Sequence, residues 1–61
     1  MEAATAKVVK RLEIDGWTLL RHGANHDIYT HPARPLPIQV PRHRMLSPGV
    51  ARSIAKAAGW I

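Results

Sequence analysis

Residues 17–30 read WTLLRHGANHDIYT, two short runs of strand-forming residues around a turn. Residues 17–21 are aromatic and apolar, residues 23–25 (Gly-Ala-Asn) are a turn signal, and residues 26–30 form the second run. Short runs of this kind joined by a glycine-containing turn are typical of a β-hairpin. We therefore expect two antiparallel strands here.

A third strand is predicted at residues 36–40, with the sequence LPIQV. Residues 31–35 (HPARP) should break the chain before it, because proline cannot donate a hydrogen bond to a β-ladder. Prolines also stand at positions 37 and 41. A strand with several prolines suits the edge of a sheet better than its centre.

An amphipathic helix is predicted before the hairpin. Thr5, Val8, Val9 and Leu12 fall at positions i, i+3, i+4 and i+7, which is one face of a helix. The pair Asp15-Gly16 should end this helix, since glycine readily adopts the left-handed conformation that follows a helix.

A second helix should open at residues 47–49 (Ser-Pro-Gly), because serine suits the N-cap and proline the first helical position. Its apolar stripe consists of Val50, Ile54 and Ala57/Ala58, and Gly59 should end it. Trp60 and Ile61 follow as an apolar clasp back onto the core.

The predicted order is helix, strand, strand, strand, helix. The simplest packing is a three-stranded antiparallel sheet with both helices on one face, an α+β fold. The 61 residues predict a single domain (1–61) with a thin core and a shallow surface site. The sequence has no cysteine and no long apolar run, so we expect neither disulfides nor a membrane span, and a cytoplasmic protein.

The net charge of +5 is unevenly distributed. Residues 1–27 contain four basic and four acidic residues, whereas residues 28–61 contain no acid. The basic residues of the second half are Arg34, Arg42, Arg44, Arg52 and Lys56. This asymmetry favours a polyanionic partner, with nucleic acid ahead of an anionic membrane. A basic surface that serves solubility is the alternative.

His26 is the candidate catalytic residue, with Asn25 beside it in the turn. Histidine exchanges protons near neutral pH. RNA supplies its own nucleophile, the 2′-hydroxyl, so its cleavage needs only a proton acceptor, a proton donor and positive charge at the phosphate. The alternative is a turn histidine without a chemical role. Asp27 should point to the opposite face and be solvated or paired with an arginine.

Residues 42–44 (Arg-His-Arg) precede the N-terminus of the last helix, where free N–H groups favour anions. Arg42, His43 and Arg44 are therefore candidate phosphate ligands. Arg52 and Lys56 extend the basic surface along one helix face, with a solvated face as the alternative. His22 and His26 are four residues apart, a spacing that suits metal binding on a helix, but they flank the predicted hairpin turn. We therefore expect no metal or other cofactor.

The ordered segments LEIDGW (12–17), GANHDIY (23–29), VPRH (40–43), SPG (47–49) and AAGWI (57–61) resemble the HicA toxin family of bacterial toxin–antitoxin systems. The resemblance covers essentially the whole chain. It implies an α-β-β-β-α fold similar to double-stranded-RNA-binding domains and an mRNA-cleaving ribonuclease activity. It also implies a catalytic histidine at position 26 and an inhibitory HicB antitoxin as partner. Ala24 stands where many relatives have serine, and Asn25 is the candidate phosphate ligand that would take over from that serine.

Two other interpretations remain open from the sequence. The chain could be a small basic RNA-binding module without catalysis, since the element order and the basic helix fit that role equally well. It could also serve as a subunit of a regulatory complex, with Trp60 and the last helix as its contact surface.

Overall fold

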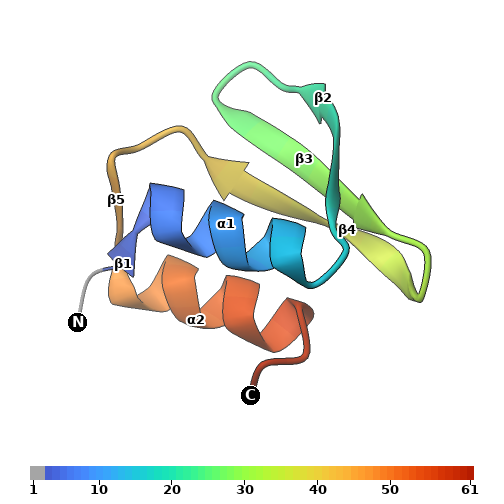
Figure 1. Cartoon of the computed structure of the whole chain (residues 1–61). Coiled ribbons are helices and arrows are strands. Elements are labelled where there is room, and N and C mark those ends of the chain that lie inside the picture. Colours follow the sequence, from blue (N-terminus) through green and yellow to red (C-terminus); the bar gives the residue numbers. More distant parts are fainter. Residues whose placement is uncertain (1–2) are drawn as a thin grey trace.

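A computed structural model describes residues 3–61 and shows two helices packed against a three-stranded sheet (Figure 1). Helix α1 spans Thr5–Ile14, and helix α2 spans Pro48–Ala57. The strands of the main sheet are β2 (Thr18–His22), β3 (His26–His31) and β4 (Arg34–Pro41). The predicted α-β-β-β-α order is confirmed and is compatible with that of double-stranded-RNA-binding domains.

Strand β4 lies at the edge of the main sheet, as its prolines predict. The strand order is β2-β3-β4, and both pairings are antiparallel. The strand starts at Arg34, earlier than expected, because a register shift between Tyr29 and His31 accommodates the segment 35–37 as a bulge. The predicted break at residues 31–35 is right for the turn at residues 32–33 and wrong for residues 34–35, which belong to β4.

The prolines of β4 fall where a missing N–H costs nothing. The Arg42 N–H donates to the Asn25 carbonyl at 3.1 Å, so residue 42 faces β3. Bonded pairs alternate along an antiparallel ladder, so residues 38 and 40 also bond to β3. Residues 37, 39 and 41 then direct their backbone groups away from the sheet. Of these three, only Gln39 presents an N–H at the free edge.

A second, two-stranded sheet was not predicted from the sequence. Strand β1 (Ala3–Ala4) pairs antiparallel with β5 (Met45–Leu46), two segments that are distant in sequence. Next to it the Thr5 N–H donates to the Arg44 carbonyl at 3.1 Å, and the Thr5 hydroxyl donates to the His43 carbonyl. These bonds hold the start of α1, which has no side-chain cap of its own.

Both helices end in the same way, with a glycine followed by a tryptophan. Gly16 and Gly59 have positive φ angles of 97° and 82°, and each N–H bonds to a carbonyl of the last turn. The Trp17 N–H bonds to Leu12 at 2.9 Å, and the Trp60 N–H bonds to Ala55 at 2.8 Å. This is the Schellman arrangement, which satisfies carbonyls at the helix end and turns the chain.

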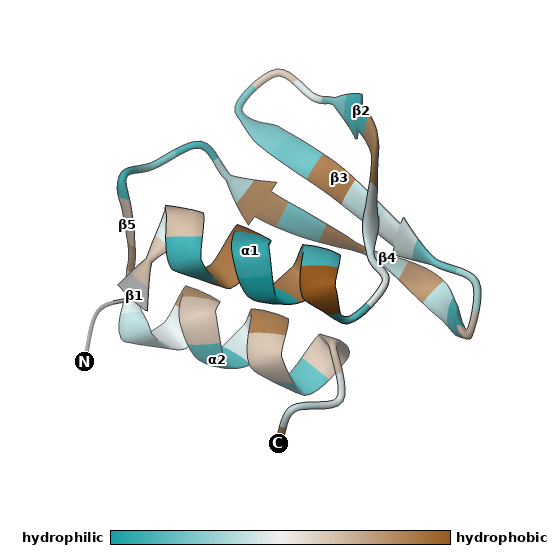
Figure 2. Ribbon diagram, viewed as in Figure 1, coloured by the Kyte–Doolittle hydropathy of each residue, from teal (hydrophilic) through white to brown (hydrophobic). Residues whose placement is uncertain are grey.

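The core lies between the helices and one face of the sheet. Hydrophobic positions of β4 alternate with polar ones, as Figure 2 shows, and Ile38 and Val40 face the helices. They pack with residues from every main element except β2, namely Leu12, Trp17, Tyr29, Leu46, Ile54 and Ala58. Each main element other than β2 thus contributes to the core, which is one layer thick.

The predicted clasp of the C-terminus is right for Trp60 and wrong for Ile61. Trp60 packs against the core, and its indole N–H donates to the Asp15 carboxylate. The guanidinium carbon of Arg11 lies 4.2 Å from the centre of the Trp60 ring, a cation–π contact. Ile61 is exposed.

Leu12→Ala should destabilise the domain strongly. Leu12 is fully buried, and such truncations cost about 2–5 kcal/mol of unfolding free energy. A domain of this size has little stability to lose, so the variant should unfold at much lower urea or without a cooperative transition. Ile14→Ala, at a position 75% exposed in the same helix, is the matched control and should change the unfolding free energy by less than about 0.5 kcal/mol. Equal effects of the two substitutions would contradict the assignment of the core.

Candidate functional site

A pocket of about 370 Å³ lies between the hairpin end of the sheet and helix α2. Its apolar wall is formed by Pro41 of β4 and by Val50 and Ile54 of α2. Its polar side chains come from four separate parts of the chain and are Asn25, His26, Gln39, His43 and Ser53. The pocket therefore unites the candidate catalytic histidine with two of the predicted phosphate ligands, Asn25 and His43.

His26 is placed in this pocket by its position as the first residue of β3. Its carbonyl accepts a 2.7 Å hydrogen bond from the Gly23 N–H, which closes the hairpin turn. A Cβ atom on Gly23 would stand 2.9 Å from that carbonyl and 3.2 Å from Nε2 of the imidazole. The turn can therefore approach the histidine ring this closely only because residue 23 has no side chain.

A second pocket of about 320 Å³ continues along the same side of the molecule. It shares Gln39, Ser53 and Ile54 with the first pocket, and its other lining residues are Pro37, Ile38 and Ala57. The two pockets form one groove between the free edge of β4 and helix α2. The histidines that line this groove, among the described residues, are His26 and His43 at its hairpin end.

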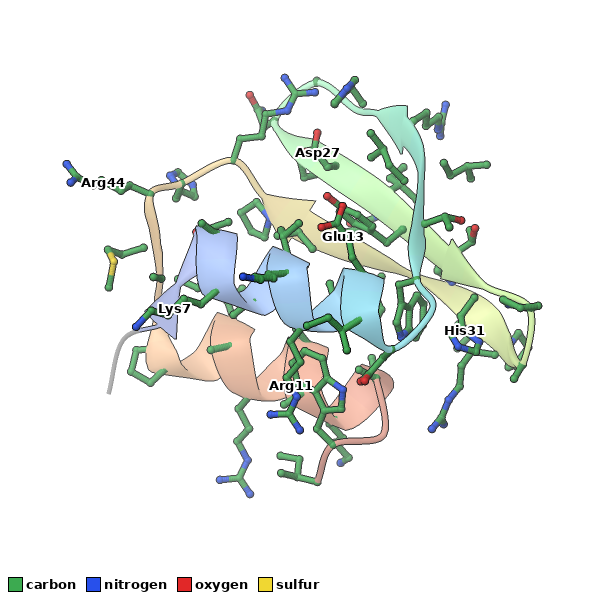
Figure 3. All side chains as sticks on the ribbon, viewed as in Figure 1. Lys7, Arg11, Glu13, Asp27, His31 and Arg44 are labelled. Atoms are coloured by element: carbon green, nitrogen blue, oxygen red, sulfur yellow. The ribbon has the colours of Figure 1, made fainter. Side chains whose placement is uncertain are left out.

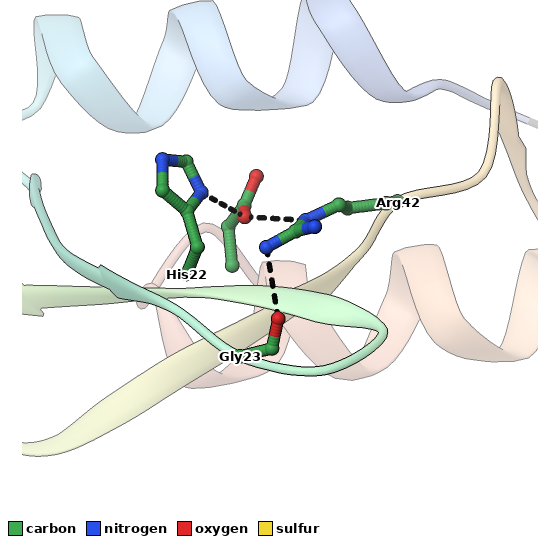
Figure 4. Close-up of polar contacts among 4 residues, drawn as sticks. His22, Gly23 and Arg42 are labelled. Atoms are coloured by element: carbon green, nitrogen blue, oxygen red, sulfur yellow. Dashed lines mark hydrogen bonds and ion pairs between the residues drawn. The ribbon is translucent and has the colours of Figure 1, made fainter.

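Asp27 points to the other face of the sheet from His26, because successive strand residues alternate. It is paired with an arginine, as the sequence suggested: its Oδ1 accepts from Nε of Arg42 at 2.8 Å. The same oxygen accepts from Nδ1 of His22 at 2.6 Å (Figure 4). The hydrogen bond from His22, followed by that from Arg42, lowers the pKa of Asp27 below its ordinary value of 3.8.

Arg42 makes three hydrogen bonds to the β2–β3 hairpin. Its backbone N–H donates to Asn25, Nε donates to Asp27, and Nη2 donates to the Gly23 carbonyl at 2.8 Å (Figure 4). The guanidinium that the sequence assigns to phosphate is therefore committed to protein partners, and it is absent from the pocket lining. In the structure it fixes the turn that holds Asn25 and His26.

The other predicted cations lie outside the pocket lining. Arg44 extends outward from the segment between β4 and β5 (Figure 3). Arg52 and Lys56 are exposed on α2, on the side away from Val50, Ser53 and Ile54, which line the groove. Within residues 3–61, the ion pairs are those of Asp27 with His22 and Arg42, so these three cations have no acidic partner there.

His31 and Tyr29 have structural surroundings. Nε2 of His31 donates to the Asp15 carbonyl at 2.8 Å, and Nδ1 accepts from the Ala33 N–H at 2.9 Å, which ties the β3–β4 turn to the end of α1. Burial raises the pKa of the Tyr29 phenol, which belongs to the core. Among the described residues no three His, Asp or Glu side chains gather closely enough to hold a metal ion.

Comparison with known proteins assigns the family. A family profile described as HicA toxin of bacterial toxin–antitoxin matches residues 5–60, nearly the whole chain. The chain belongs to the HicA toxin family. The resemblance read from the sequence is thereby confirmed. A search of curated proteins found no match to the chain.

HicA membership makes the chain a toxin of a toxin–antitoxin system. Sequence reasoning missed Gln39 and Ser53 in this pocket, because Gln39 belongs to no motif and Ser53 is explained by a position on the helix surface. The strand alternation and the helical spacing Val50, Ser53, Ile54 were the only available signals. Within residues 3–61, neither helix has the length and hydropathy needed to cross a bilayer.

Arg42→Ala should raise the pKa of Asp27 towards its ordinary value, because it removes one of the two hydrogen bonds that stabilise the carboxylate. Carboxyl NMR shifts recorded against pH measure this change. A lowered pKa in the folded state stabilises the fold above the unfolded value, and this stabilisation is lost as the pH falls through the lowered pKa. The acid limb of stability should therefore flatten in the variant. Arg44→Ala, which removes an exposed arginine two residues away, should leave the Asp27 titration unchanged.

Gly23→Ala should displace the His26 ring, because the added methyl group would meet both the His26 carbonyl and Nε2. Imidazole ¹H–¹⁵N spectra report the displacement as shifted His26 resonances. Ala24→Ser, at the exposed neighbouring position, is the control and should leave them in place. Unchanged His26 resonances in a folded Gly23→Ala protein would show that the close approach does not matter.

Proposed function

We propose that this HicA-family chain is an endoribonuclease that cleaves mRNA without a metal ion, with His26 as a general acid or base. The observation that supports the proposal most directly is the position of His26 in a pocket with Asn25 and His43, in a chain of a toxin family. RNA brings the 2′-hydroxyl as nucleophile, so a shallow site with an imidazole and phosphate contacts is sufficient.

The proposed phosphate contacts divide into two groups. Asn25 and His43 line the pocket and would touch the reacting phosphate. Arg44, Arg52 and Lys56 lie outside it and would attract neighbouring phosphates of the chain through their field. Arg42 would contribute chiefly by holding the turn, since its guanidinium already bonds to Asp27 and Gly23.

A HicB-type antitoxin is the proposed inhibitor. The exposed cations of residues 44–56 have no acidic partner within the described chain, so an acidic protein surface would be attracted to the same region as RNA. Covering the pocket would keep RNA from His26. Since mRNA is the proposed substrate, the cytoplasm is the proposed compartment.

His26→Ala should reduce the rate of RNA cleavage by about 10²–10⁴-fold, the usual contribution of a general acid–base group. The assay incubates purified protein with an mRNA transcript in EDTA and follows fragments on a gel. His22→Asn is the matched control, because it removes an exposed imidazole outside the pocket while its amide replaces the ring as donor to Asp27. Circular dichroism checks that each variant is folded.

The same assay separates catalysis from simple binding. DNA of the same sequence should remain intact, because it lacks the 2′-hydroxyl. Cleaved DNA would contradict the mechanism, and loss of cleavage on adding EDTA would contradict the absence of a metal. A gel shift of RNA without any cleavage by the parent protein would instead support the non-catalytic RNA-binding module.

A further inference from the structure

Two histidines, His26 and His43, line the same pocket although they come from different segments of the chain. His26 begins β3, and its register partner is Pro41 at the end of β4. His43 follows Pro41 by two residues, after the chain has left the strand. The pairing of β3 with β4 therefore brings both imidazoles to the hairpin end of the groove.

The remaining lining of this pocket contains no acid, lysine or arginine. Asn25, Gln39 and Ser53 are polar without ionising near neutral pH, and Val50, Ile54 and Pro41 are apolar. The charged residues next to the two histidines in sequence are also absent from the lining, since Asp27 and Arg42 bond to each other and Arg44 extends outward (Figure 3). Among the side chains that line the pocket, the two imidazoles are thus the usual candidates for general acid–base catalysis.

The imidazole of His43 makes no hydrogen bond that supports the described part of the fold. The bond that this residue makes to the start of α1 uses its backbone carbonyl, which accepts from the Thr5 hydroxyl. Its imidazole is exposed and makes no hydrogen bond among the described residues, in contrast to His22 and His31, whose rings bond to Asp27 and to the Asp15 and Ala33 backbones. A histidine needed only for the fold would show such partners.

We propose that His26 and His43 form the general acid–base pair of the reaction, one on each side of the scissile phosphate. This inference rests on the proposed ribonuclease function and adds its second catalytic residue. One imidazole accepts the proton of the 2′-hydroxyl as that oxygen attacks phosphorus. The P–O5′ bond breaks, and the other histidine, as imidazolium, donates its proton to the departing 5′-oxygen. The products are a 2′,3′-cyclic phosphate and a 5′-hydroxyl, and exchange with water restores both histidines.

The volume of the pocket is consistent with this arrangement. About 370 Å³ is sufficient for a phosphate and part of its flanking nucleotides, and the continuing groove beside Gln39 and Ser53 leaves room for the chain on one side. Asn25 and Ser53 offer hydrogen bonds to the non-bridging oxygens. The negative charge that develops on the phosphate would therefore be met by neutral donors and the imidazolium.

The test is a leaving-group experiment with the parent protein, His26→Ala, His43→Ala and His43→Gln. The cleavage site is first mapped on a transcript, and an oligonucleotide is then made with sulfur in place of the 5′-oxygen at that linkage. A thiolate departs without protonation, so the general acid is no longer needed. His43→Ala and His43→Gln should each lower kcat on ordinary RNA by about 10²–10⁴-fold, while KM stays within about threefold of the parent protein's KM. With the sulfur substrate, one of the two alanine variants should cleave at a rate within tenfold of the parent protein's rate. The other alanine variant should remain slow.

The pH profile provides the second measurement. The parent should show a bell-shaped dependence of kcat/KM on pH, and each alanine variant should lose one limb, a different limb in each case. His22→Asn, which keeps a side-chain donor for Asp27, should keep the bell shape and the rate. Cleavage by folded His43→Ala within threefold of the parent, rescue of both variants, or rescue of neither would overturn the pair while leaving a ribonuclease that depends on His26. A parent protein that cleaves no RNA would overturn the proposed function as well.

Discussion

The three hydrogen bonds of Arg42 to the β2–β3 hairpin determine the geometry of the candidate site. They join the segment that follows β4 to Gly23, Asn25 and Asp27, so the two segments that contribute His43 and His26 cannot move independently. Bonds to a charged donor are stronger than neutral ones, and Asp27 is held as a carboxylate by its lowered pKa. Arg42 thus combines a backbone hydrogen bond to Asn25 with an ion pair to Asp27.

The alternation of β3 separates this structural cluster from the chemistry. Asp27 faces Arg42 and His22, whereas His26 faces the pocket and helix α2. Asp27, next to the candidate catalytic histidine in sequence, is therefore not its hydrogen-bond partner. The pocket keeps two imidazoles without a carboxylate between them, which suits a reaction in which the incoming phosphate supplies the negative charge. Glycine at position 23 allows the turn to lie against the His26 ring.

The two helices of this small domain end in the same kind of chain reversal. Both helices end in a glycine with positive φ and a tryptophan that turns back onto the molecule. Trp17 enters the core, while Trp60 packs beside it and bonds to Asp15. The core needs only one layer of side chains, and the reaction needs no enclosed cavity. The length of the chain and the openness of the groove are therefore consistent with each other.

Local patterns in the sequence were sufficient for the helices, the hairpin and the edge position of β4, and they named His26 as the candidate catalytic residue. Apolar spacing, glycine and proline act within a few residues, so their effects are visible without the fold. The two-stranded sheet of Ala3–Ala4 with Met45–Leu46, the bulge in β4 and the pocket residues Gln39 and Ser53 depend on contacts between distant segments. The structural role of Arg42 also required the tertiary structure. The sequence shows that residue 42 is charged, but it does not show that its guanidinium bonds to the Asp27 carboxylate and the Gly23 carbonyl. The sequence by itself determined which side chains are able to move a proton, and only the packing of β4 and α2 decided which of them share a pocket.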